Sequence, residues 1–123
     1  MRESEKDPVR LCHILEAIDN LLTSYKQIDF ERLSNKDIRY FGMVKLLEII
    51  GEASYMLTNE FKDAHPLTPW KQIIDMRHIL VHGYYKMDKA YIQSTIEEDL
   101  QPLRSQISRY IKESGTQSNT EEV

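Results

Sequence analysis

The chain has 123 residues, of which 41% are hydrophobic and 29% charged, enough apolar material for one folded core and too much for a disordered chain. This length excludes a second sizeable domain and any fold that needs about 250 residues, such as a (β/α)₈ barrel. Sixteen basic and twenty acidic residues give a formal charge of −4, which argues against a broad basic surface for nucleic acid.

Cysteine usage and hydropathy predict the compartment. The one cysteine, Cys12, cannot form a disulfide within the chain or a multi-cysteine zinc site, which indicates a reducing environment. The charged first residues do not resemble a signal peptide, and no window has the ~18 uncharged apolar residues of a membrane span. We therefore expect a soluble, cytoplasmic protein, with Cys12 filling space in the core.

Apolar periodicity predicts an all-helical protein, beginning with an amphipathic helix that extends to about Tyr25. Asp7 is the expected N-cap of this helix, and Pro8 is suited to its first position. A connector over residues 27–35, with a short turn near Phe30, should join this helix to the next one.

The second predicted helix starts at Ser34 or Asn35 and ends near Asn59. Its apolar residues cover more than the ~100° stripe of a surface helix, so it should contact neighbours on more than one side. It therefore lies either at the centre of a bundle or in a dimer seam. Gly42 and Gly51, inside this helix, are expected to allow close helix crossings.

A loop over residues 61–67 precedes the third predicted helix, which has Thr68 as N-cap, Pro69 in its first turn and Gly83 at its end. Trp70 should be a packing residue rather than a base-stacking platform. The residues expected on the buried side of this helix are Trp70, Ile73, Ile74 and Val81.

Asp88 should cap the last helix, and Pro102 should bend or divide it. Residues 1–112 thus form a single helical domain, an antiparallel bundle of four to five helices, and residues 113–123 form an acidic, disordered tail. The apolar face of the last helix comprises Ile92, Ile96, Leu100, Leu103, Ile107 and Ile111.

Chemically versatile side chains gather at the end of the third helix. His78 and His82 are four residues apart and share a helix face, and Arg77 precedes His82 by five residues. A chain reversal at Gly83 could bring His82 and Tyr84 beside Arg77.

Three interpretations of this cluster compete. A zinc site would need further ligands from His13, His65, Cys12 or an acid, and Arg77 would repel the cation. A structural role would pair Arg77 with Asp75 or Glu52, since Glu52 lies in an apolar helix and needs a partner.

The third interpretation is phosphoryl transfer on RNA. Histidine moves protons near neutral pH, and arginine binds the oxygens of a phosphate in a bidentate manner. Together they could cleave RNA through the ribose 2′-hydroxyl without a metal ion or other cofactor, and DNA lacks that hydroxyl. Periodicity alone favours the structural interpretation.

Residues 77–84, RHILVHGY, resemble the Arg-x4-His-x-Tyr motif of HepT-like proteins, the toxin members of the HEPN superfamily. Further likenesses are the DPVRLCHILEAI of residues 7–18, the IGEA of residues 50–53 and the Pro-Trp at residues 69–70. The resemblance extends over about residues 7–111, nearly the whole predicted fold.

The resemblance implies a helical bundle that forms a homodimer, in which the motifs of two chains meet in one cleft. His82 would be the acid/base group and Arg77 the phosphate-holding group, so that both are catalytic. His78 and Glu52 would assist, His78 being equally suited to a helix-end role.

The resemblance also implies regulation by a partner, a minimal nucleotidyltransferase antitoxin. This enzyme would attach AMP to Tyr84, and the added phosphate would occupy the RNA site and silence the nuclease. Tyr85 stands where the family more often has phenylalanine, so it is a second candidate for modification. The alternative function is a catalytically lapsed HEPN module that serves only as partner and AMP acceptor of the nucleotidyltransferase.

Local charge rather than net charge decides whether such a cleft can hold RNA. The tail after Lys112 carries −3, which leaves 16 basic and 17 acidic groups in residues 1–112. Two copies of Arg77, with Lys86 and Lys89 nearby, are expected to supply the positive potential in a dimer.

Overall fold

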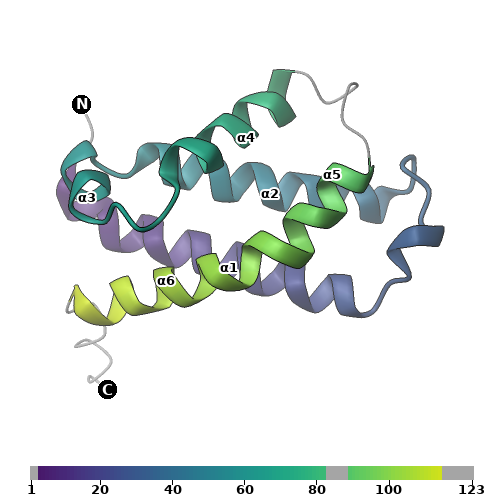
Figure 1. The fold of residues 1–123 in the computed structure, drawn as a ribbon, viewed down its shortest axis with the longest axis horizontal. Helices are drawn as coiled ribbons and strands as arrows, with labels where there is room; N and C mark the ends of the chain where they lie inside the picture. The colour runs from purple at the N-terminus through teal and green to yellow at the C-terminus, as the bar shows by residue number, and fades with distance from the viewer. Residues whose placement is uncertain (1–2, 83–88, 115–123) are drawn as a thin grey trace.

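The computed structural model describes residues 3–82 and 89–114, in which helices predominate and no strand occurs (Figure 1). This confirms the all-helical prediction. The α-helices of these ranges are α1 (Asp7–Lys26), α2 (Ile38–Met56), α3 (Asn59–Ala64), α4 (Trp70–His82), α5 (Lys89–Ser94) and α6 (Leu100–Glu113). Short 3-10 turns occupy Ser4–Lys6 and Phe30–Arg32, and a π-helical turn over Thr95–Asp99 joins α5 to α6.

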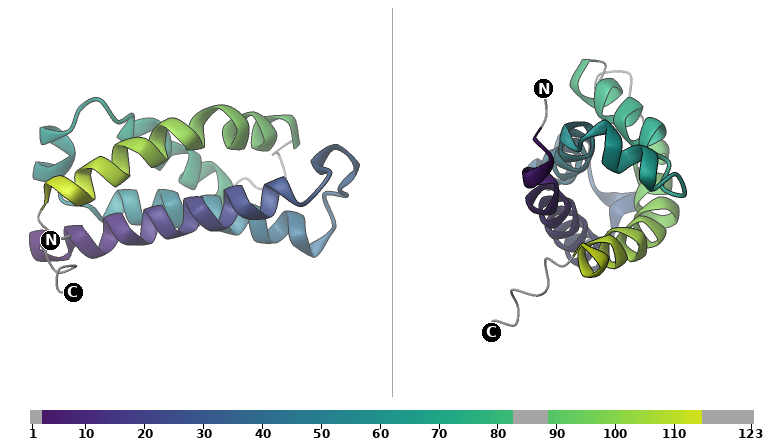
Figure 2. Two further views of the ribbon diagram at one scale, coloured as in Figure 1. Left: turned by 90° about the horizontal axis from the view of Figure 1, so that it is seen from below. Right: turned by 90° about the vertical axis from the view of Figure 1, so that its left-hand side faces the viewer.

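The helices form an antiparallel bundle. α1 and α2 are the two arms of a hairpin, α4 packs on α2, and α6 packs on α1. The views of Figure 2 show α1, α2 and the α5–α6 run extending along the bundle, with α4 crossing one side. No helix in the described ranges combines the length and apolarity needed to cross a membrane.

The core lies between these helices, and its most deeply buried side chains are branched aliphatic ones. Each one that is fully buried stabilises the fold by about 1.5–3 kcal/mol relative to exposure. The apolar face predicted for the last helix is confirmed, since Ile92, Ile96 and Ile107 are all 1% exposed or less. The most deeply buried aliphatic residues are Leu11, Ile14, Ile18, Leu21, Leu47, Ile50, Leu57, Leu80, Ile92, Ile96 and Ile107.

Asp7 was predicted to cap α1, but it lies in the first turn of that helix, and its carboxylate is buried. This carboxylate accepts hydrogen bonds from the backbone N–H of Thr58 (3.0 Å) and from its hydroxyl (2.7 Å). The Thr58 hydroxyl in turn accepts from the N–H of Phe61 and caps α3. The prediction of a loop over residues 61–67 is therefore wrong for residues 61–64, because a tertiary contact stabilises a short helix there.

Three further predictions about helix ends and faces are corrected. α2 begins at Ile38 rather than at residue 34 or 35, because the Asp37 carboxylate accepts from the N–H of Arg39 and caps it. Cys12 is exposed rather than part of the core, and Val81 is exposed, whereas Met76 and Leu80 are the buried residues of this part of α4.

Thr68 is not the cap of α4, which begins at Trp70. Its hydroxyl donates to the side-chain oxygen of Gln106 (2.7 Å) and shares a hydrogen bond with the Tyr110 hydroxyl (2.6 Å). It therefore ties the start of α4 to α6. Of the other predictions on this part of the chain, the end of α4 at Gly83 and the cap at Asp88 fall outside the described residues. Of the tail predicted over residues 113–123, Glu113 is the last residue of α6, and residues 115–123 fall outside the described residues.

Pro102 divides the last helical run without ending it. Proline has no N–H to donate to the carbonyl of Glu98, four residues earlier, and the π-helical turn lies just before it. The helix axis therefore continues through the turn, and the apolar face is preserved from α5 into α6.

The two glycines of α2 have different roles. A Cβ at Gly51 would lie 2.2 Å from the Cβ of Arg77 and 3.2 Å from its Cα, so only glycine permits this approach of α2 and α4. A Cβ at Gly42, by contrast, would have no atom within 4 Å. The prediction of a close crossing is confirmed for Gly51 and wrong for Gly42.

We expect Gly51→Ala and Gly42→Ala to change stability in opposite directions. The first should lower the free energy of unfolding by about 1–3 kcal/mol, because α4 must move away from α2. The second should raise it by about 0.5–1 kcal/mol, because alanine is the better helix former at an open position. Urea denaturation followed by circular dichroism measures both, and an equal effect of the two substitutions would contradict the assignment.

Candidate active site

Trp70 anchors the first turn of α4 and thereby sets the direction of the helix that carries the predicted cluster. Its side chain is 7% exposed, and its indole N–H donates to the carbonyl of His65 (2.9 Å). Its ring contacts Phe61 and Tyr110. The prediction that Trp70 is a packing residue is confirmed.

Arg77 lies where α4 comes closest to α2. Because Gly51 has no side chain, the Cβ and Cγ of Arg77 lie directly against the backbone of α2. The aliphatic stem of the arginine is therefore held between two helices, while its side chain as a whole remains 30% exposed. The guanidinium is thus both positioned by the fold and accessible to solvent.

Glu52, the next residue of α2, pairs with this guanidinium. The Nε of Arg77 lies 2.8 Å from the Oε1 of Glu52, whose side chain is 48% exposed. Asp75, the other partner considered for Arg77, pairs with Lys71 instead, at 2.7 Å. The contact predicted between Glu52 and Arg77 is confirmed, and it places a carboxylate against the Nε edge of the guanidinium.

His78 and His82 lie side by side on the exposed surface of α4. Their ring centroids are 4.6 Å apart, which confirms that they share one face of the helix. Both side chains are accessible to solvent. α4 therefore carries one cationic group held against α2 and two titratable rings at its C-terminal end.

Lys89 does not contribute positive charge in the way predicted. Its Nζ donates to the carbonyls of Phe30 (2.7 Å) and Leu33, and it lies 4.9 Å from the centroid of the Phe30 ring. These contacts bind the start of α5 to the α1–α2 connector. Tyr84, Tyr85 and Lys86 fall outside the described residues.

A groove between α1 and α2 adjoins Glu52. Its volume is about 470 Å³, and Arg10 and His13 of α1 line it together with Glu52. The Nε of Arg10 is buried there without a hydrogen-bond partner among the described residues. His13 was predicted only as a possible metal ligand, and Arg10 was not predicted as a site residue; the three-residue spacing of Arg10 and His13 on α1 was the available signal.

The described side chains are suited to anion binding and proton transfer. Within residues 3–82 and 89–114, no three histidine, cysteine or acidic side chains are grouped so that they could hold a metal ion. Arg77 offers a guanidinium with several N–H donors, and His82 offers an imidazole ring that can donate or accept a proton. Such groups can hold a phosphate and move a proton beside it.

Comparison with known proteins identifies relatives over most of the chain. Residues 14–110 match the family described as Ribonuclease HepT-like. "Putative RNase MJ1380" of Methanocaldococcus jannaschii is 36% identical over 98 residues, which cover 79% of this chain and 89% of the relative. "Probable ribonuclease HepT" of Thermococcus cleftensis is 34% identical over 112 residues, which cover 91% of this chain and 100% of the relative. No solved structure shows significant similarity.

We expect Glu52→Gln to release Arg77 with little effect on stability. Because both side chains are partly exposed, the free energy of unfolding should fall by no more than about 1 kcal/mol. The side-chain N–Hε signal of Arg77 in a ¹H–¹⁵N spectrum should nevertheless shift, since the group 2.8 Å from its Nε is no longer charged. Glu48→Gln, which removes a partner of Lys45 on the same helix, should leave that signal in place. An Arg77 signal that both variants leave unchanged would contradict the pairing.

Proposed function

Because the chain belongs to the HepT-like ribonuclease family, we propose that it is a metal-independent endoribonuclease and the toxin of a toxin–antitoxin pair. One observation supports this assignment most directly. Arg77 is held at the Gly51 crossing beside Glu52, is partly open to solvent, and lies on the same helix as the exposed His82.

Arg77 is suited to holding the scissile phosphate. Its Nε forms an ion pair with Glu52, and no hydrogen bond to its guanidinium occurs among the described residues. The two terminal nitrogens can then donate to two phosphate oxygens at once. Negative charge builds on these oxygens as the phosphorus becomes five-coordinate, so the interaction strengthens in the transition state.

His82 would move the protons. In the proposed step the ribose 2′-oxygen forms a bond to phosphorus, and the bond from phosphorus to the 5′-oxygen breaks. A base takes the 2′-hydroxyl proton and an acid gives a proton to the 5′-oxygen, which leaves a 2′,3′-cyclic phosphate and a 5′-hydroxyl. His82 takes one of these roles, and either His78 or the His82 of a second copy takes the other.

A homodimer would bring two such sites together through the outward face of α2. Ile38, Phe41 and Ile49 are 82%, 51% and 36% exposed, and they lie on one stripe of the helix with Gly42 and Glu52. Exposed apolar side chains in such a stripe are typical of protein–protein interfaces. Because Glu52 belongs to the stripe, a second copy docked there would place both Glu52–Arg77 pairs near the interface.

The proposed regulation acts on the chain segment after His82. A minimal nucleotidyltransferase antitoxin would transfer AMP from ATP to the Tyr84 hydroxyl and release pyrophosphate. Tyr84 follows His82 by two residues, so the added phosphate stays within reach of the groups that hold the RNA phosphate. The modification would exclude RNA by occupying that site and by charge repulsion.

We expect the purified protein to cleave single-stranded RNA in the presence of EDTA. His82→Ala should lower the rate by about 10²–10⁴-fold, because it removes the acid/base group. Arg77→Ala should lower it by about 10²–10³-fold, because it removes charge stabilisation. Arg109→Ala, an exposed arginine on α6, should have no effect. Cleavage by the His82→Ala variant at the wild-type rate would refute the assignment, and loss of activity in EDTA would refute metal independence.

Incubation with ATP and a minimal nucleotidyltransferase of the proposed kind should add the mass of AMP to the protein. Tyr84→Phe should abolish the adduct and Tyr85→Phe should retain it, whereas Tyr55→Phe, at an exposed tyrosine of α2, serves as the control. Intact-protein and peptide mass spectrometry locate the adduct. An adduct that both Tyr84→Phe and Tyr85→Phe retain would refute the proposed switch.

A further inference from the structure

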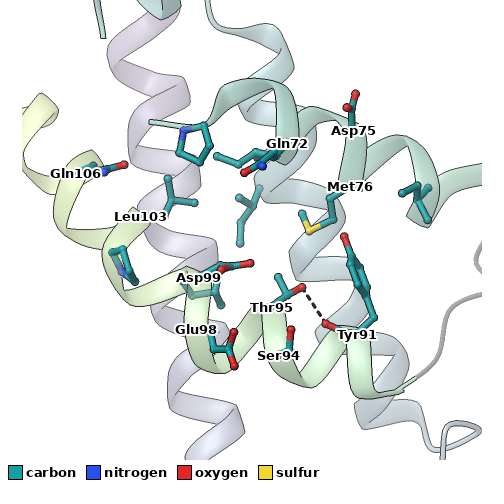
Figure 3. Close-up of a pocket in the computed structure, with 16 residues that line it drawn as sticks. Gln72, Asp75, Met76, Tyr91, Ser94, Thr95, Glu98, Asp99, Leu103 and Gln106 are labelled. Carbon is teal, nitrogen blue, oxygen red and sulfur yellow. Dashed lines mark hydrogen bonds between the residues drawn. The ribbon is translucent and has the colours of Figure 1, made fainter. Parts of the chain in front are cut away.

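A second and larger cavity lies between α4 and the α5–α6 run, on the flank of α4 that bears Met76 (Figure 3). Its volume of about 590 Å³ is within the range of small-ligand and peptide sites. Its floor is apolar and includes Ile50, Met76 and Leu103, all of them buried. Ile79 and Tyr91 line it from α4 and α5, and both are among the large hydrophobic side chains that remain exposed, at 45% and 40%.

The rim of this cavity is acidic. Asp75, Glu98 and Asp99 line it, and none of its lining residues is Lys, Arg or His. Asp75 is paired with Lys71, but Glu98 and Asp99 are exposed and form no ion pair with the described residues. Burial and the negative charge of Asp99 also raise the pKa of the Tyr91 phenol. RNA phosphates would be repelled here, so the cavity is unsuited to the substrate proposed above.

The fold keeps this cavity open. α6 is bound to α1 by an ion pair between Arg104 and Asp19 (2.5 Å), and the π-helical turn is bound to α1 by the Tyr25 hydroxyl, which donates to Glu97. α4 is packed on α2 at the Gly51 crossing. Two helical segments fixed to different neighbours thus leave an elongated groove between them.

We propose that this groove binds a helical segment of a partner protein in which lysine or arginine side chains flank an apolar stripe. Apolar side chains would pack on Met76 and Leu103, and the cationic groups would reach Glu98 and Asp99 at the rim. Residues 115–123 of this chain are unsuitable, since they contain Glu121 and Glu122 and no basic residue.

Fluorescence anisotropy with the full chain tests this proposal. The probe is a fluorescein-labelled peptide built only of leucine and lysine, with leucine at i, i+3, i+4 and i+7. Wild type should bind it, and a peptide with glutamate in place of lysine should not bind. The double variant Glu98→Gln/Asp99→Asn should weaken binding about threefold to tenfold. Ser94→Trp, which places an indole in the groove, should weaken it more than about tenfold.

The matched control is Glu60→Gln/Glu113→Gln, which removes the same charge from exposed positions on α3 and α6 away from the cavity. It should bind the lysine peptide as wild type does, and the amide signals of Gln72, Ser94 and Gln106 should shift on binding. Equal weakening by the control and the Glu98→Gln/Asp99→Asn variant would show attraction by net charge alone and refute the proposal. Failure of wild type to bind would also refute it. Neither result depends on RNA cleavage, and unchanged thermal melts verify that each variant is folded.

Discussion

The close approach of α2 and α4 at Gly51 determines where the functional groups of this protein lie. An ideal Cβ on Gly51 would be 2.2 Å from the Cβ of Arg77, a separation that packed atoms do not adopt. The absence of one methyl group therefore lets the stem of Arg77 lie on the backbone of the neighbouring helix. Glu52, one residue further along α2, is then in reach of the Arg77 Nε. Two consecutive residues of α2 thus set both the position and the orientation of a cation on α4, which is the precision that a site built on rigid helices provides.

The pairing of Arg77 with Glu52 affects charge as well as geometry. A half-exposed ion pair contributes little to stability, so its main effect is to order a flexible side chain. It also cancels much of the positive potential at the site, and Lys89 is bound to backbone carbonyls rather than free to replace it. A single chain therefore presents a weakly cationic surface. A second copy docked near Glu52, as proposed above, would bring another guanidinium together with its own carboxylate, so the proposed dimer would add phosphate-binding N–H groups rather than net positive charge.

The sequence predicted the helices well and the contacts between helices poorly, for a physical reason. Periodicity reports which face of a helix is apolar, and it correctly identified the buried face of the α5–α6 run. It does not report where a face ends, so Cys12 and Val81, at the edges of their stripes, were wrongly expected to be buried. Nor does it show which distant groups meet. α3 depends on the carboxylate of Asp7, which lies 51 residues before Thr58, and no local pattern reveals that contact.

The candidate site shows the same division. Arg77, His78 and His82 were found because they are close in sequence, and the Glu52 contact was found because a carboxylate in an apolar helix needs a partner. The acidic cavity was not found, because its residues come from α2, α4 and the α5–α6 run, and each segment alone looks like an ordinary amphipathic helix.

α4 connects the two surfaces that the protein presents. Arg77 lies on the flank that contacts α2, whereas Met76 and Ile79 face the acidic cavity on the other flank. The two flanks differ in charge, so a phosphate chain and a cationic helix would each be attracted to one of them and repelled from the other. Both could then be bound at the same time. Arg77 and Met76 are adjacent in sequence, so a single helix supplies residues to both surfaces.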